Sequence, residues 1–203
     1  MIKEKHIKWI IIGWIILTIS NFYFVPYFIV AFGWFGLLAG FFAIAIYQII
    51  KTIKERKQIT KLRLYKLTLF LALFFLTLYG RYVDRLIEKV DWRIFYNKRT
   101  EIVEQVKSND LNPNVDWNGW VCELPFEFPV ISHGGNDIGI IRNEEKNTTT
   151  VTFWIFRNFF SAPSTRLIYT NDSAKIESIN KLIKRHPKDN WKIEENWYRT
   201  YGE

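Results

Sequence analysis

A stretch of 42 residues without a charged side chain, residues 9–50, is the feature that most constrains this chain of 203 residues. About 20 apolar residues, rising about 1.5 Å each, cross a hydrocarbon core of roughly 30 Å, so the stretch is long enough for two membrane-spanning helices. Ser20, Asn21 and Pro26 favour a break between them, because proline lacks an amide proton and disfavours helix in the residue before it. The sequence predicts spans over residues 10–24 and 27–50.

A third apolar run, residues 67–80, lies between Lys66 and Arg81. It is shorter than a spanning helix needs, but the aliphatic stems of both cations can carry their charges to the headgroups. We therefore expect a third span over residues 64–83. The three predicted transmembrane helices form an α-helical membrane anchor, residues 1–83.

The formal net charge of +8 lies entirely in residues 1–66, where ten Lys and Arg residues face two acids. The rest of the chain carries eighteen charges of each sign, so no nucleic-acid partner is expected. Seven of the ten cations lie in the loop 51–66, and the loop between the first two spans has none. Because cytoplasmic loops are rich in cations, we expect the N-terminus and loop 51–66 in the cytoplasm and residues 84–203 outside it.

Two features of the predicted anchor each allow two interpretations. Gly36 and Gly40 form a Gly-xxx-Gly pair, which predicts close helix packing in a homodimer or, as we favour, against another span of the same chain. The loop 51–66 either sets orientation alone, as we favour, or also binds anionic headgroups. The apolar runs contain no Asp, Glu, Lys, Arg or His, which argues against a pump or an ion-coupled transporter.

Residues 84–203 are predicted to form an extracytoplasmic α+β domain with a mainly antiparallel sheet. Apolar positions recurring every three or four residues predict an amphipathic helix over residues 84–107, continuous with the third span. The sheet and a short helix are expected within residues 114–203. Asn118 and Gly119 predict a two-residue type I′ hairpin turn, which would put Val115, Trp117, Trp120 and Cys122 on one packed face.

Turn residues and alternating apolar side chains predict the remaining elements. A helix should begin after Asp172 or Ser173, which can cap it, and end before Pro187. The predicted strands cover residues 128–131, 138–142, 149–157, 165–170 and 191–198.

An enzyme interpretation would use Cys122 as a nucleophile, His133 as its base and Asp137 to orient the histidine. The predicted hairpin buries Cys122, whereas an activated cysteine is partly exposed, so catalysis by this set is not favoured. The three histidines are far apart in sequence and show no metal-ligand spacing, so neither a metal site nor a cofactor is expected.

The segment 153–160 is unusually rich in aromatic residues on both faces of a predicted strand. One interpretation is a central strand that is covered on both sides. The other is an exposed patch for a protein partner, since aromatic and arginine residues are favoured interface anchors. The candidate partner-binding residues are Trp154, Phe156, Arg157, Phe159 and Phe160.

The leading hypothesis is a multi-pass inner-membrane protein of bacterial type, whose partners are the lipid bilayer and an envelope or membrane protein. Its extracytoplasmic domain would act in recognition, as in a sensor, an accessory protein or an immunity-like protein. The alternatives are a membrane-bound cell-envelope enzyme whose catalytic groups are not identified, and a structural subunit held through Gly36 and Gly40.

Overall fold

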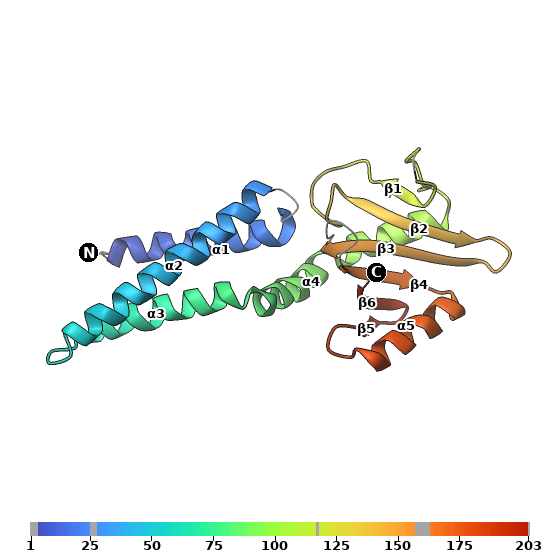
Figure 1. Ribbon diagram of the computed structural model, residues 1–203. Coiled ribbons are helices and arrows are strands. Elements are labelled where there is room, and N and C mark those ends of the chain that lie inside the picture. Colours follow the sequence, from blue (N-terminus) through green and yellow to red (C-terminus); the bar gives the residue numbers. More distant parts are fainter. Residues whose placement is uncertain (1–3, 25–27, 117, 157–162, 203) are drawn as a thin grey trace. The chain divides into compact units, whose positions relative to one another are not determined.

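The computed structural model describes residues 4–24, 28–116, 118–156 and 163–202 (Figure 1). In these residues the chain forms five helices and one six-stranded antiparallel sheet. The contacts divide the chain into two compact units, residues 1–90 and 91–203. An apolar helical part and a small α+β part are therefore both present, as the sequence predicts.

The first unit contains α1 (Glu4–Phe24), α2 (Phe28–Lys54), α3 (Lys61–Leu78) and the start of α4 (Gly80–Lys107). Among the described residues, two helices are long and apolar enough to cross a membrane, and three if the bent pair α3 and α4 counts as one span. Phe41, Phe70 and Leu73 form a buried cluster between α2 and α3. Trp14 Nε1 donates a hydrogen bond to Thr77 Oγ1 over 2.9 Å, which joins α1 to α3.

The predicted continuity between the third span and the following helix is wrong. The helix α3 ends at Leu78, and α4 begins at Gly80 at an angle of 78° to it. Between them, Tyr79 leaves helical geometry with φ −99° and ψ 40°. Glycine is a weak helix former, and a side chain at position 80 would come within 3.4 Å of Trp34 Cζ2.

The sheet of the second unit has the order β1-β2-β3-β4-β6-β5, and every neighbouring pair is antiparallel. Three predicted strands, 138–142, 149–157 and 165–170, are confirmed with shifts of at most one residue at their ends. The strands are β1 (Val121–Glu123), β2 (Asp137–Asn143), β3 (Thr148–Phe156), β4 (Ser164–Thr170), β5 (Trp191–Glu194) and β6 (Trp197–Gly202). The predicted short helix is α5 (Ser173–Arg185), and Asp172 caps it by accepting a hydrogen bond from the Ala174 amide over 3.0 Å.

The predicted strand 128–131 is absent from the described sheet. Pro129 cannot donate to a strand ladder, and the side chain of Asn136 organises this segment instead. Its Oδ1 accepts hydrogen bonds from the amides of Ile131 and Ser132 at 2.6 and 3.0 Å. Its Nδ2 donates to three carbonyl oxygens, those of Phe126, Glu127 and Pro129. The result is a fixed irregular loop.

One predicted turn and one predicted strand are also corrected. Gly119 does not adopt the positive φ that a type I′ turn requires, and the backbone pairs Val115 with Asn118 instead. The predicted strand 191–198 is a hairpin of β5 and β6, with Asn196 at φ 62° in its turn. Asparagine tolerates this left-handed conformation better than most residues, so the chain reverses where alternation alone predicts continuation.

Helices cover both faces of the sheet. On one face Trp197 contacts the rings of Phe153 and Tyr169, and Trp92 of α4 packs on Trp197 at 5.1 Å between centroids. On the opposite face Ile179 of α5 packs on Ile168 and Tyr198. The second unit is thus a three-layer arrangement, with the light-green end of α4 behind the strands in Figure 1 and α5 on the other side.

Candidate anion-binding site

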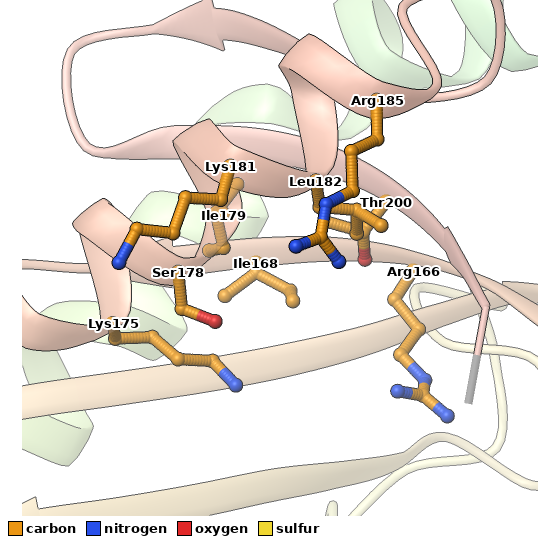
Figure 2. Close-up of a pocket in the computed structure, with 9 residues that line it drawn as sticks. All are labelled: Arg166, Ile168, Lys175, Ser178, Ile179, Lys181, Leu182, Arg185 and Thr200. Atoms are coloured by element: carbon orange, nitrogen blue, oxygen red, sulfur yellow. The ribbon is translucent and has the colours of Figure 1, made fainter.

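A cavity of about 310 Å³ lies between α5 and the face of β4 and β6 that α5 covers (Figure 2). The described residues that line it are cationic, hydroxylic and aliphatic, and none of them carries a carboxylate. The helix contributes Lys175, Ser178, Ile179, Lys181, Leu182 and Arg185, and the strands contribute Arg166, Ile168 and Thr200.

The amphipathic pattern of α5 brings its cations to the cavity. Three isoleucines on one stripe, Ile176, Ile179 and Ile183, anchor the helix against the sheet. The steps from Lys175 to Ser178, Leu182 and Arg185 are three, four and three residues, so these side chains form a second stripe beside the apolar one.

The strand register brings polar groups to the opposite wall. Arg166 of β4 pairs with Thr200 of β6, so the two side chains lie next to each other on the face under α5. Ile168, two residues further along β4, shares that face and packs against α5. The cavity therefore has a polar end and an aliphatic floor.

Most of the positive charge in the cavity has no counter-charge. Lys181 is exposed and forms an ion pair with Glu177 at 2.6 Å. Within the part of the chain that the structure describes, no acidic side chain forms an ion pair with Arg166, Lys175 or Arg185. In Figure 2 Lys181 extends away from the other three cations.

Arg166 has the most unusual environment of the four. Its guanidinium is half-buried, and its Nε is buried without a hydrogen-bond partner. Burial lowers the pKa of Arg166, because removing water disfavours the charged form. The rest of the guanidinium lines the cavity, where an anion would supply the missing negative charge and accept hydrogen bonds from its other N–H groups.

The residues of the enzyme hypothesis do not form an activated nucleophile. Cys122 is buried, as predicted, and its Sγ lies 3.6 Å from the carbonyl oxygen of Glu123. Burial raises the pKa of Cys122, Arg142 lowers it, and Asp137 and Glu123 raise it, with a net increase. A thiol with a raised pKa holds less of the reactive thiolate at neutral pH. Asp137 therefore acts against an activated Cys122.

His133 lies in a different environment. It is 1 % exposed, and burial together with the charge of Arg99 lowers the pKa of His133 to about 3.

The prediction that Trp120 and Cys122 share one face of the sheet is wrong. The ring of Trp120 lies over Gly139, whereas Cys122 pairs with Ile138, whose side chain points to the other face. The described residues contain no group of three or more His, Cys, Asp or Glu side chains that could hold a metal ion.

The aromatic segment is only partly within the described residues. Trp154 is 5 % exposed and packs against Trp120, with 5.7 Å between ring centroids, so Trp154 fits the interpretation of a strand covered on both sides and not that of an exposed patch. It is covered because its face of the sheet carries both α5 and Trp120. Phe156 is the last residue of β3 and pairs with Thr165. Arg157, Phe159 and Phe160 lie outside the described residues.

Gly36 and Gly40 line an apolar groove of about 320 Å³ between α1 and α2. A side-chain carbon added at either glycine would meet nothing within 4 Å. Within the described chain these glycines therefore make no close backbone contact with a neighbouring helix. Packing through this pair, in a homodimer or otherwise, stays a prediction.

Sequence reasoning missed the cationic cavity. Two signals were present: Arg166 interrupts an otherwise uncharged strand, and Lys175 and Arg185 border the apolar stripe of α5. Neither signal shows that the strand and the helix face each other, because that contact depends on the tertiary fold. No protein-family model, curated protein or solved structure matches the chain. What it binds is therefore inferred from the chemistry of its own residues.

Proposed function

We propose that the chain is an integral membrane protein whose α+β part recognises an anionic ligand in the cavity between α5 and the sheet. The observation that carries this proposal is the half-buried Arg166, whose Nε has no hydrogen-bond partner, in a cavity with two further cations that no described acid neutralises. A cleft lined by charges of one sign focuses the electrostatic potential and attracts ligands of the opposite sign.

The membrane arrangement is part of the proposal. Three spans place the N-terminus and the basic loop 51–66 in the cytoplasm, and the α+β part outside the cytoplasm of a bacterial-type cell. The concentration of cations in residues 1–66 supports the orientation of the N-terminus and the loop. The third span requires that the bent pair α3 and α4 crosses the membrane as one segment, in addition to α1 and α2.

Recognition fits the cavity better than catalysis. The lining residues that the structure describes offer ammonium, guanidinium and hydroxyl groups, which bind and orient anions, and among them is no carboxylate, imidazole or thiol that could transfer a proton near neutral pH. A second candidate function, that of a subunit of a membrane complex, is supported by the open groove at Gly36 and Gly40, since small residues admit the close approach of another helix.

The test measures the thermal stability of the full chain in a non-ionic detergent. Phosphate, sulfate or citrate is added at constant ionic strength, with chloride as the reference. A ligand that binds the folded state stabilises it by about 2.7 kcal/mol at a concentration 100 times its Kd, so at least one anion should raise Tm clearly.

The double change Arg166→Gln and Arg185→Gln should abolish this stabilisation, because it removes the guanidinium groups from both walls. Lys184→Gln is the matched control, since Lys184 is exposed on α5 and does not line the cavity. Equal stabilisation of the wild type and the double variant, or no stabilisation by any of the three anions, would contradict the proposed function.

A further inference from the structure

We infer that the ligand is a phosphoester, with its phosphoryl oxygens among Arg166, Lys175 and Arg185 and its organic part on the aliphatic floor of the cavity. This inference rests on the proposed function and specifies the chemical class of the ligand. Three properties of the cavity carry it: the direction of its donors, its charge and its size.

The donors come from two opposing walls. Lys175 and Arg185 extend from α5, and Arg166 belongs to β4 on the other side (Figure 2). A carboxylate has two oxygens in one plane, and a single guanidinium fork can satisfy both. A phosphoryl group has three or more oxygens in a tetrahedral arrangement, so it can accept hydrogen bonds from both walls at the same time.

The charge favours the same class. Within the described residues three lining cations have no acidic partner, since Glu177 engages only Lys181. A carboxylate would bring one negative charge, whereas a phosphate monoester carries about −1.5 to −2 at neutral pH. The hydroxyls of Ser178 and Thr200 can both donate and accept hydrogen bonds, so they suit phosphoryl oxygens in either protonation state.

The size and the floor argue for a ligand larger than an inorganic ion. A volume of about 310 Å³ lies at the lower end of the range for small-molecule pockets, about 300–1,000 Å³. Ile168, Ile179 and Leu182 supply the apolar surface that an attached organic group would cover. A soluble phosphate monoester carries this combination of groups, and a phospholipid headgroup also offers tetrahedral phosphoryl oxygens on an organic part, although its phosphodiester brings one negative charge.

The experiment compares five soluble probes on the full chain in a non-ionic detergent at constant ionic strength. Glycerol 3-phosphate carries the proposed chemistry, and glycerate has a carboxylate in place of its phosphorylated CH2 group. Inorganic phosphate and sulfate test the anion without the organic part, and glycerol tests the organic part without the anion. Calorimetry should give the tightest binding for glycerol 3-phosphate, weaker binding for inorganic phosphate and no binding for glycerol. A separate arm compares nanodiscs of phosphatidylglycerol with nanodiscs of phosphatidylcholine, to distinguish a lipid headgroup from a soluble ester.

Arg166→Gln should weaken glycerol 3-phosphate binding about tenfold or more, because it removes a charge-assisted hydrogen-bond donor. Arg166→Lys keeps the positive charge but lacks the planar guanidinium with its parallel N–H donors. Its affinity for glycerol 3-phosphate should therefore fall between that of the wild type and that of Arg166→Gln. Lys184→Gln should bind like the wild type. The melting temperature of each variant without ligand shows whether it is folded.

The outcomes separate the two proposals. If glycerate or sulfate binds as tightly as glycerol 3-phosphate and Arg166→Gln abolishes that binding, the phosphoester class is wrong and anion recognition stands. If no anion binds, or if binding is unaffected by Arg166→Gln, both are wrong. Stabilisation in phosphatidylglycerol nanodiscs, with loss in Arg166→Gln, assigns the phosphoester to a lipid, whereas binding of the soluble ester alone assigns it to a soluble molecule.

Discussion

Two arginines of the α+β part differ in how their charge is balanced. Arg99 is fully buried, and its Nη2 donates to Asp91 Oδ2 at 2.7 Å and to the Ile131 carbonyl oxygen at 3.0 Å. A buried charge with such partners is already satisfied. Arg166 is half-buried and has no comparable partner among the described residues. This contrast is why Arg166, and not Arg99, is expected to meet a ligand.

His133 makes the stability of the fold depend on pH. In the unfolded chain its imidazole takes up a proton near pH 6.5, whereas in the folded chain burial and Arg99 lower the pKa of His133 to about 3. The unfolded chain therefore binds more protons between these values, and the free energy of unfolding falls as the pH falls through this window. We expect a loss of about 2 kcal/mol between pH 7.5 and pH 5 from this residue.

Denaturant unfolding of the full chain in detergent, followed by tryptophan fluorescence at several pH values, measures this dependence. His133→Gln should flatten the slope between pH 7.5 and pH 5. His186→Gln, at an exposed position after α5, should leave it as in the wild type. If His133→Gln keeps the full slope, the dependence comes from other groups.

At the scale of the elements, the sheet face that carries α5 is completed by one tryptophan. The helix covers β4 and β6, and the ring of Trp120 lies over Gly139 of β2 and against Trp154 of β3. A side-chain carbon at position 139 would lie 2.4 Å from Trp120 Cζ3, so only glycine leaves room for the ring. This contact explains how β3, which has large apolar side chains on both of its faces, is covered on both faces.

Gly139→Ala should therefore displace Trp120 and lower the free energy of unfolding by about 1–3 kcal/mol, the usual cost of overpacking. Tryptophan emission should shift to the red as Trp154 gains water. In a Trp120→Leu background the same glycine change should cost much less, since the main clash is gone. Equal losses of unfolding free energy in both backgrounds would show that the added carbon is opposed by Thr152 and not by Trp120. The Cβ of Thr152 would lie 3.3 Å from that carbon.

Elements with strong local signals could be predicted from the sequence. The strands β2, β3 and β4 follow from alternating apolar residues, and α5 from its cap at Asp172 and its apolar stripe. The break at Tyr79, the turn at Asn196 and the loop around Asn136 could not, because each depends on one residue whose backbone or side-chain geometry overrides the pattern. The cavity could not be predicted, because the two-residue connection from β4 to α5 does not determine which face of the sheet the helix covers or which side chains meet there.

At the scale of the whole molecule, the expected membrane topology is directly testable. A reporter that is active only after export should work when fused after residue 203, and a reporter that requires the cytoplasm should work when fused at Lys57. The physical reason is the difference in cation content between the loop 51–66 and the loop between α1 and α2. A full cytoplasmic signal from the fusion after residue 203 would contradict this topology and place the proposed anion site inside the cell.

The order of the strands has a consequence for how fast the α+β part can assemble. Four of the five neighbouring pairs in the described sheet join strands that follow each other in sequence, and β4 with β6 is the pair that does not. Pairs with short connections close early, since the entropy lost in closing a loop grows with its length. We expect β6 to join β4 only after α5 and β5 have been synthesised. Arg166 and Thr200, which belong to the sheet wall of the cavity, therefore come together late in folding, so a nascent chain completes the proposed anion site near the end of the process.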